Sequence, residues 1–552
     1  MEPQEPTSNW PAPGDSFEGA VAMLSESQRR AIDSPSSALC IVAGAGSGKT
    51  RVLTLRVARR IRDGSAEADH TAVCTFTRKA AGELRDRLGL YGVPVSTPVA
   101  TGGVPGPGVR AGTLHQLALT LLRRHALDSG DPPPLVAEHR FRIVSAIVGD
   151  AAVASVVDTE IGWAKARCLT PETYAEAAVD AGRAGGMAGT TIDQVGGAFA
   201  SYELALRRKR SLDLDDVLVH SADLLDNDRA FADGVRWRYR HLSVDEFQDV
   251  NPAQFRLLRG LLGDGNDVCV VGDPNQAIYG WNGADPSLLA RLPEMMPGME
   301  VVRLDENHRS TPQVVAAATA GLGRSVAPPP RSVAADGPMS VVTAYDDDRA
   351  EAEGVVSLLM GRSEDGQPWS DQAVLARTHD QLATIGRALA RAGIPYRIAP
   401  GPESLTARVR TSEGAPGHPQ PLAALRGPRR GGPVVAADEA VELATFHRAK
   451  GLEWTSVHVV GLEEGYVPIV YAASAEAHDE ERRLFYVALT RASHDLHCSW
   501  ARVRRMGNGR DMERQPSPWL AAVARVSRTG KGRVTPRDPG RRIAEIRAGL
   551  GN

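Results

Sequence analysis

The 552-residue sequence predicts an α/β protein made of two tandem units with parallel sheets, plus a helical insertion in the first unit. Three observations predict this fold class. Short apolar or β-branched runs recur in both halves, and each leads into a turn or a helical pattern, as strands do in parallel sheets covered on both faces. Helical patterns at about 115–210 interrupt the first series of runs. A Pro- and Gly-rich stretch at 321–338 predicts a surface linker between the two series.

The elements follow in chain order. Residues 1–20 are Pro-rich and acidic, so we expect a disordered leader, with order beginning near Leu24. The predicted strands are 38–43, 72–77, 241–246 and 267–272 in the first half, then 301–304, 339–344, 373–377, 441–446 and 457–461 in the second. Residues 401–440 hold six Gly and six Pro, which predicts a loop or disordered segment. The tail from Ala521 has eight basic and two acidic residues, which predicts a flexible basic arm.

Composition narrows the function classes. The 64 basic and 67 acidic residues give a net charge of -3, so a nucleic-acid partner would require local clusters of positive charge. The five cysteines form no CxxC pair, which argues against a disulfide framework and a zinc ribbon. Cys40, Cys74 and Cys269 lie in predicted strands and are expected in the core. The N-terminus does not resemble a signal peptide and no apolar run approaches a membrane span, so we expect a soluble intracellular protein.

The segment AGAGSGKT (43–50) follows a predicted strand and opens a helical pattern, which is the setting of a phosphate-binding P-loop. Glycines let backbone N–H groups approach phosphates, Lys49 can reach the β- and γ-phosphates, and Thr50 can ligate Mg²⁺. Ala43 stands where the general motif has Gly, and the alternative is a chance Gly-rich turn. The candidate phosphate-binding residues are Ala43, Gly44, Ala45, Gly46, Ser47, Gly48, Lys49 and Thr50.

Adjacent carboxylates end another predicted strand in VDEFQD (244–249). In a P-loop ATPase, an acidic pair at this place can hold Mg²⁺ and polarise the attacking water. We therefore assign Asp245 to the metal and Glu246 to the general base, together with Thr50 as the second metal residue. A lone acidic pair would otherwise be read as a solvated turn.

With these two motifs in place, the order of ten segments resembles the superfamily 1 DNA helicases of the UvrD/Rep/PcrA type, over about Leu24 to Leu520. GLEW (451–454), SW (499–500) and PSPWL (516–520) look closest to the actinobacterial second UvrD-like branch. The matching segments are LSESQRRAI (24–32), AGAGSGKT (43–50), AVCTFTRKAA (72–81), GTLHQ (112–116), DLDDVL (213–218), VDEFQD (244–249), VVGDPNQAIYGWNGAD (270–285), LDENHRS (304–310), VELATFHRAKGLEW (441–454) and EERRLFYVALTRA (480–492).

The resemblance implies two tandem RecA-like P-loop domains, 1A and 2A, each interrupted by an insertion. The accessory domain 2B that usually interrupts 2A is expected to be reduced to the Pro- and Gly-rich stretch. The implied divisions are a leader at 1–20, domain 1A at 21–116 and 210–310, the helical insertion 1B at 117–209, domain 2A at 311–400 and 441–525, the vestigial 2B at 401–440 and the basic tail at 526–552.

The resemblance also implies ATP and Mg²⁺ as cofactors and gives roles to individual residues. Gln28 would read the adenine edge, Glu453 would contact the ribose, and Arg51 would add a further nucleotide contact. Gln276 and Arg309 would contact the γ-phosphate, and Arg491 would be the arginine finger. Because the two arginines belong to the second unit, ATP is expected in the cleft between the units. His308 stands where the family usually has the Tyr that stacks on adenine.

Single-stranded DNA is the implied partner, together with junctions between single and double strands. Such binding combines ring stacking with a groove that follows the phosphates. Phe76, Tyr279 and Trp281 are the candidate stacking rings, although core packing is the alternative for each. The remaining candidate DNA contacts are Thr75, Thr77, His115 and His447. The sequence departs from the family at Asn282, Leu114 and Arg78, which replace Arg, Phe and Asn.

The resemblance therefore implies a cytoplasmic, nucleoid-associated ATP-dependent DNA helicase that moves 3′ to 5′ on single-stranded DNA in repair or replication. It implies no membrane partner, and the repair-protein partners stay unknown. One alternative is a translocase that displaces bound proteins with little unwinding, because 2B is reduced. Another is a P-loop ATPase acting on protein partners. The acidic group Asp213, Asp215 and Asp216 is expected to pack or to cap a helix, and the basic tail to be solvated or to touch DNA.

Overall fold

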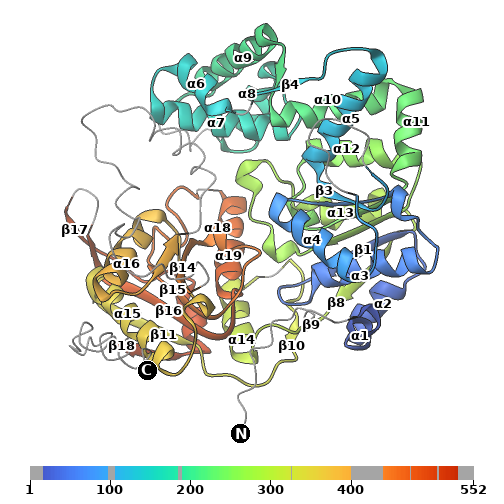
Figure 1. Cartoon of the computed structure of the whole chain (residues 1–552). Helices are drawn as coiled ribbons and strands as arrows, with labels where there is room; N and C mark the ends of the chain where they lie inside the picture. The colour runs from blue at the N-terminus through green and yellow to red at the C-terminus, as the bar shows by residue number, and fades with distance from the viewer. Residues whose placement is uncertain are drawn as a thin grey trace. The chain divides into compact units, whose positions relative to one another are not determined.

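The computed structural model describes residues 16–96, 106–137, 139–183, 189–324, 326–398, 439–472, 474–505 and 509–531. Contacts within the chain divide it into two compact units (Figure 1). The first comprises Met1–His308 and Val326–Pro330, and the second Arg309–Ser325 and Arg331–Asn552. Each unit contains a parallel sheet with helices, so the predicted fold class is confirmed.

The sheet of the first unit has the strand order β3-β2-β6-β7-β1-β8, and every neighbouring pair in it is parallel. Its strands are β1 (Ala38–Ala43), β2 (Thr71–Thr75), β3 (Arg110–Thr113), β6 (His241–Val244), β7 (Val268–Gly272) and β8 (Glu300–Leu304). The helices around it are α1 (Phe17–Ala22), α2 (Glu26–Asp33), α3 (Lys49–Arg62), α4 (Arg78–Leu90), α5 (Leu114–Ser129), α10 (Leu214–Asn227), α11 (Arg229–Arg238), α12 (Pro252–Leu262) and α13 (Ser287–Met295).

Two separate cores cover the two faces of this sheet because side chains along a strand alternate between faces. Leu39 and Ile41 of β1 pack with residues of α1 to α4. Ala38 and Cys40 of the same strand pack with residues of α5, α10, α12 and α13. The three strand cysteines are buried, as predicted. Burial raises the pKa of the Cys40 and Cys74 thiols to about 12.

Four helices of the described residues form the insertion, which has a core of its own (Figure 1). They are α6 (Arg140–Val148), α7 (Ala151–Ala166), α8 (Pro171–Asp180) and α9 (Ile192–Lys209). The predicted boundary at 116/117 falls inside α5, whose first turns belong to the core of the sheet through Leu114, Leu117 and Leu121. Short strands flank the helices at β4 (Leu135–Val136) and β5 (Ser211–Leu212), and these two pair in parallel.

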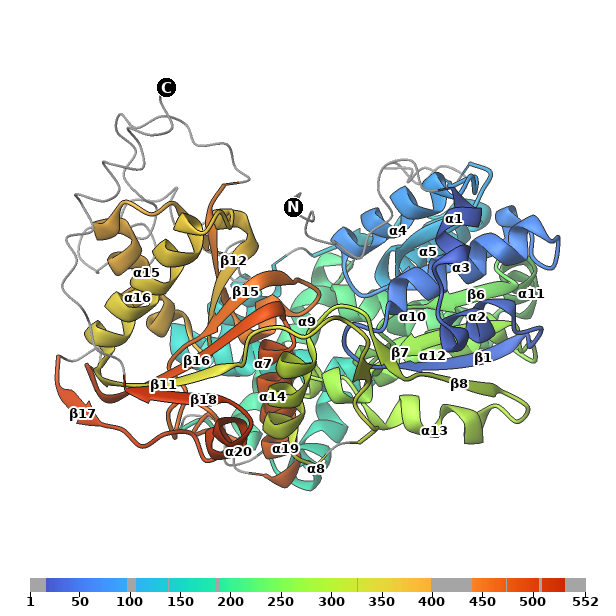
Figure 2. The ribbon, with the colours of Figure 1, turned by 90° about the horizontal axis from the view of Figure 1, so that it is seen from below.

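The sheet of the second unit has the order β13-β14-β12-β15-β16-β11-β18, with β17 antiparallel to β16 at one end. Helices α15 and α16 cover one face, and α14, α19 and α20 cover the other (Figure 2). The strands are β11 (Val341–Asp347), β12 (Gln372–Ala376), β13 (Tyr396–Ile398), β14 (Val441–Thr445), β15 (Trp454–Val459), β16 (Ala492–Arg505), β17 (Asp511–Glu513) and β18 (Arg528–Lys531). The helices are α14 (Pro312–Leu322), α15 (Asp348–Glu364), α16 (His379–Ala392), α18 (Phe446–Ala449), α19 (Ala475–Leu489) and α20 (Leu520–Arg525).

Two predictions about the ends of the chain are wrong in part. Order begins before Leu24, because α1 starts at Phe17, whose ring is buried against Tyr91 at 6.1 Å between centroids. At the other end, β18 extends the sheet by pairing with β11, so Arg528 to Lys531 are not a free arm. The rest of the predicted leader and tail, and nearly all of 401–440, lie outside the described residues.

The strand assignments also need correction. The run at 301–304, grouped by its apolar pattern with the strands of the second half, belongs to the first sheet, where β8 pairs with β1. Strands β3 and β16 were not predicted. The first is short, and the second mixes charged and apolar residues in SHDLHCSWARVRR, so neither presents a continuous apolar run. No helix in the described parts of the chain is long and apolar enough to cross a membrane.

Candidate functional site

The sequence-predicted motifs of the first unit meet at one edge of its sheet. Parallel strands place their carboxyl ends together, which is where ligands bind in open α/β sheets. Strands β1, β2, β6 and β7 are neighbours and end here, so the residues that follow them form what we term the carboxyl edge. The layout is that of P-loop nucleotide-binding proteins.

The loop between β1 and α3 takes the conformation that its glycines allow. Gly46 and Gly48 have φ of 72° and 80°, in the left-handed region that disfavours other residues. Any Cβ at Gly46 would collide with the side chain of Asn307, whose amide donates to the Ala45 carbonyl at 2.9 Å. Ala43, in contrast, is the last residue of β1 and is buried in the core. A methyl group is therefore accommodated where the general motif has Gly.

The two predicted metal residues touch each other directly. The Thr50 hydroxyl donates to Oδ2 of Asp245 at 2.9 Å. Burial, followed by the negative charge of Glu246, raises the pKa of Asp245 to about 6. Lys49 lies close by, with its Nζ 3.9 Å from Oδ2 of Asp273. The edge thus gathers a hydroxyl and buried carboxylates, which are the ligand types that Mg²⁺ prefers.

The predicted general base has a strained backbone. Glu246 has φ of 53°, which is rare for a residue other than glycine and is often found at functional positions. Gln248 donates a short hydrogen bond from Nε2 to Oε2 of Glu246. The predicted γ-phosphate residue Gln276 donates to Oδ2 of Asp273 at 2.7 Å.

Sequence reasoning did not single out Gln248, Asp273 or Asn307. All three lie inside segments that carry the resemblance, at VDEFQD, VVGDPNQ and LDENHRS. Polar residues in such segments are the signal that could have found them. The structure adds their burial, since each is at most 2% exposed.

The predicted adenine-side residues are engaged within their own unit. Gln28 is buried, donates to the Ser47 carbonyl at 2.9 Å and accepts from the Ser25 backbone at 3.1 Å. Arg51 donates to the Ala20 carbonyl at 3.0 Å and so ties α3 to the end of α1. The backbone of His308 donates to the Gly46 carbonyl at 2.9 Å. Gln28 and His308 therefore both brace the loop that follows β1.

In the second unit, Arg309 and Glu453 form an ion pair. Arg491 lies in the same unit at the end of α19 and is only 2% exposed. Its guanidinium donates to the carbonyls of Leu452 and Val487 at 3.0 and 2.9 Å and to the Thr490 hydroxyl at 3.1 Å. The predicted arginine finger is thus held by its own unit in this conformation.

Two of the three predicted stacking rings lie against each other. Phe76 and Tyr279 stack with centroids 5.3 Å apart and an angle of 13° between planes. Trp281 lies on the same loop as Tyr279 and is 46% exposed, so core packing does not account for it. This loop packs against the helical insertion. A Cβ added at Gly283 would lie 2.5 Å from the Cβ of Ala166 on α7.

The remaining candidate DNA residues differ in exposure. Thr75 is buried, and its hydroxyl has no hydrogen-bond partner among the described residues. Thr77 is exposed and its hydroxyl accepts from the backbone of α4. Burial lowers the pKa of His115 to about 4, and burial together with Arg377 lowers the pKa of His447 to about 3. Both imidazoles are therefore neutral at pH 7 and offer hydrogen bonds rather than charge.

The acidic group at 213–216 is structural, as predicted. Asp213 caps α10 by accepting from the Asp216 backbone at 2.8 Å. It also pairs with the buried Lys165 at 2.9 Å, and Asp215 pairs with Arg140 at 2.6 Å. The group joins the helical insertion to α10.

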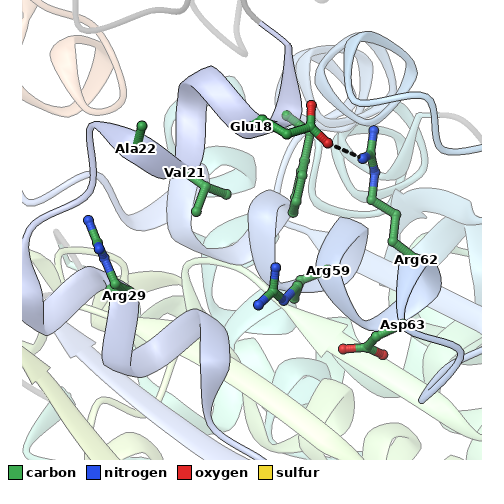
Figure 3. Close-up of a pocket in the computed structure, with 8 residues that line it drawn as sticks. Glu18, Val21, Ala22, Arg29, Arg59, Arg62 and Asp63 are labelled. Atoms are coloured by element: carbon green, nitrogen blue, oxygen red, sulfur yellow. Dashed lines mark hydrogen bonds and ion pairs between the residues drawn. The ribbon is translucent and has the colours of Figure 1, made fainter.

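A pocket of about 580 Å³ lies away from the carboxyl edge, among α1, α2 and the far end of α3 (Figure 3). Arg62 pairs with Glu18 there at 2.7 Å, and its guanidinium stacks over Phe17. Lys49 starts α3 and Arg59 lies ten residues on, so roughly 15 Å separates the pocket from the loop. The pocket has no part in the carboxyl edge.

Comparison with known proteins follows this geometry. The model of the UvrD/REP helicase N-terminal domain matches residues 24–297, and that of the UvrD-like helicase C-terminal domain matches 302–402 and 433–503. The chain therefore belongs to the UvrD-like helicase family. It is 33% identical over 591 residues to the "ATP-dependent DNA helicase UvrD2" of Mycobacterium tuberculosis (strain ATCC 25618 / H37Rv), an alignment that covers 91% of this chain and 82% of that protein.

Two further relatives match a shorter part of the chain. The "DNA helicase II" of Escherichia coli (strain K12) is 31% identical over 393 residues, covering 68% of this chain and 51% of that protein. The "ATP-dependent DNA helicase PcrA" of Leuconostoc citreum is 30% identical over 397 residues, covering 68% and 50%. The similarity to these two relatives thus spans about half of their length.

Proposed function

We propose that this protein is an ATP-dependent DNA helicase that hydrolyses ATP with Mg²⁺ and moves 3′ to 5′ along single-stranded DNA. Family membership supports the class of activity. The observation that carries the proposal for this chain is the carboxyl edge, where the Thr50–Asp245 pair, Glu246 and the loop bearing Tyr279 and Trp281 meet. The predicted nucleotide-binding residues and the predicted stacking rings thus follow strands of the same sheet.

The residues at the edge fit a nucleotide phosphate chain. Backbone N–H groups at the start of α3 and the charge of Lys49 suit phosphates, and the glycines keep Cβ atoms out of the loop. Thr50 and Asp245 would hold Mg²⁺, which would neutralise charge on the phosphates. Gln28, Arg51 and His308 would lie on the nucleoside side of the site.

Within this proposal Glu246 takes a proton from the attacking water. A carboxylate at hydrogen-bond distance of the water is the group that this step needs. Gln276 would contact the γ-phosphate, since its amide lies beside Asp273 at the end of β7.

Arg309 and Arg491 would add positive charge to the γ-phosphate, and Glu453 would contact the ribose. In the structure the two arginines bind Glu453 and backbone carbonyls. They would exchange these partners for phosphate oxygens, which form stronger charge-assisted hydrogen bonds. Nucleotide binding would therefore break the Arg309–Glu453 ion pair.

For DNA, Phe76, Tyr279 and Trp281 would stack with bases, at about 1 to 3 kcal/mol per base. Thr75, Thr77, His115 and His447 would contact the strand by hydrogen bonds, because neither imidazole is charged at pH 7. Junctions between single and double strands would be partners as well. DNA as the substrate also favours a cytoplasmic, nucleoid-associated location.

One alternative function, a translocase, would use the same ATP hydrolysis. The match to the C-terminal domain model is interrupted between residues 402 and 433, where the sequence is rich in Pro and Gly. A reduced accessory domain would favour a translocase that displaces bound proteins and unwinds little.

The test measures ATP hydrolysis with and without an oligonucleotide, then unwinding of 3′-tailed and 5′-tailed duplexes. We expect DNA to stimulate hydrolysis and only the 3′-tailed duplex to be unwound. Lys49→Ala serves as the inactive control. Displacement of a protein block without unwinding would favour the translocase. An ATPase rate that DNA leaves unchanged would reject the proposal in favour of a P-loop ATPase acting on proteins.

A further inference from the structure

One side chain bridges the predicted general base and the loop of the predicted phosphate sensor. Gln248 lies in the turn after β6 and is fully buried. Its Nε2 donates to Oε2 of Glu246, and its Oε1 accepts from the backbone N–H of Asp273 at 2.9 Å. Both the nitrogen and the oxygen of the amide therefore form hydrogen bonds with residues of the carboxyl edge.

The orientation of this amide follows from its partners. A backbone N–H can only donate, so the oxygen of Gln248 must face Asp273. The amide nitrogen then faces Glu246, whose carboxylate accepts the hydrogen bond. A Cβ at Gly272 would lie 2.8 Å from Oε1 of Gln248, so the glycine leaves room for the amide at this place.

The bridge continues into the loop after β7. Asp273 caps the short helix Pro274–Gln276 through its Oδ1, and its Oδ2 accepts from Gln276 at 2.7 Å. A continuous hydrogen-bonded path thus runs from Glu246 through Gln248 and Asp273 to Gln276. Tyr279, which stacks on Phe76, follows three residues later on the same loop.

We propose that Gln248 is a positioning residue that holds the Glu246 carboxylate and ties its orientation to the loop of Gln276 and Tyr279. The inference rests on the proposed function. A shift of that loop on DNA binding would move Asp273, and Gln248 would transmit the movement to Glu246. Stimulation of hydrolysis by DNA would depend on this amide.

The first experiment compares Gln248→Met, which keeps the length of the side chain but removes both hydrogen bonds, with Gln248→Glu. The glutamate can still accept from Asp273 but cannot donate to Glu246. We expect both variants to lose about 10²-fold in DNA-stimulated kcat, the scale of a misplaced catalytic group, with KM for ATP changed by less than about 3-fold. The ratio of stimulated to unstimulated rate should approach one.

The matched control is Gln254→Met, because Gln254 is also a buried glutamine of the first unit but caps α12. It should retain wild-type stimulation. A melting temperature for each variant separates lost positioning from lost folding. If Gln248→Met does not fold, Gln248→Glu decides alone.

A double variant separates this inference from the function on which it rests. If Gln248 acts through Glu246, adding Gln248→Met to Glu246→Gln should slow hydrolysis no further. An additional loss of the full single-variant factor would overturn the inference, as would wild-type stimulation in both Gln248 variants. In contrast, a wild-type enzyme that DNA does not stimulate, with an active Glu246→Gln variant, would reject the proposed function itself.

Discussion

Polar side chains are buried in both units, but they are satisfied differently. At the carboxyl edge of the first unit, Asp245, Gln248 and Asp273 all have hydrogen-bond partners within the edge. In the second unit, one face of the sheet buries Gln372, on β12, and His458, on β15. Both polar atoms of Gln372 and both ring nitrogens of His458 have no partner in the described part of the chain.

The difference teaches that buried polar groups alone do not locate a functional site. What marks the carboxyl edge is the connection between its polar groups, since hydrogen bonds join the first turn of α3 to the turns after β6 and β7. On the face in the second unit, burial instead adds a desolvation penalty that no hydrogen bond among the described residues offsets for Gln372 and His458. Variants of the first region should therefore change chemistry, and variants of the second should change stability.

The largest effect is expected for Glu246→Gln. The amide keeps the size of the side chain but cannot take a proton, so DNA-stimulated kcat should fall by about 10² to 10⁴-fold while ATP still binds. Steady-state hydrolysis and a nucleotide-binding titration measure the two quantities. Glu83→Gln, at an exposed position on α4, is the control. Near-normal turnover of Glu246→Gln would show that the carboxyl edge takes no part in ATP hydrolysis.

Trp281→Ala should have the next largest effect. Loss of one stacking ring should weaken binding to single-stranded DNA by about 1 to 3 kcal/mol, which is roughly 5- to 150-fold. The DNA concentration that gives half-maximal stimulation of the ATPase measures it. Trp237→Ala is the matched control, because Trp237 is a 64% exposed tryptophan of the same unit on α11. Equal behaviour of the two variants would exclude the loop of Trp281 from DNA binding.

The second region should respond to pH. Burial, helped by Arg362 and opposed by Glu351, lowers the pKa of His497 to about 4, and burial also lowers the pKa of His458. The unfolded chain therefore binds protons more readily, so stability present above about pH 6.5 should fall as the pH drops towards 4, by on the order of 2 to 3 kcal/mol. Denaturant unfolding at several pH values measures it.

A variant pair tests the source of this acid sensitivity. Replacing both His458 and His497 by Leu should flatten the pH dependence. His494→Gln, at an exposed position on the same strand as His497, should leave it as in the wild type. An unchanged slope in the double variant would assign acid lability to other groups.

The smallest effect is expected for Gln372→Leu. Removing a buried amide that has no hydrogen-bond partner among the described residues should be neutral or stabilise the second unit by up to about 1 kcal/mol. Gln381→Leu is the contrast, because Gln381 is also buried but donates to the Gly461 carbonyl at 3.0 Å and accepts from the Thr378 backbone at 3.0 Å. It should destabilise by about 1 to 3 kcal/mol. A strong loss in Gln372→Leu would show that its amide is satisfied in solution.

Sequence patterns were sufficient where local chemistry decides. The apolar runs that became β1, β2, β6 and β7 were each placed to within two residues of the structure. The loop at 43–50, between a strand and a helix, could be predicted because glycine spacing, a lysine and a following helix form one local motif. The acidic group at 213–216 was read correctly as a capping and packing cluster, because capping too is local.

Only the tertiary structure decided the strand partners and the hydrogen bonds between remote segments. These contacts depend on which distant parts of the chain come together in the fold. Strand β8 joins the first sheet by pairing with β1, some 260 residues earlier, and its apolar pattern does not reveal this partner. The mixed sequence of β16 becomes a central strand because β15 and β11 flank it. Likewise, Gln248 lies two residues from Glu246 in the sequence, but only the return of the chain along β7 brings Asp273 to its other end. A hydrogen bond between remote segments leaves no periodic pattern in the sequence, and this is why the bridge became visible only in the folded chain.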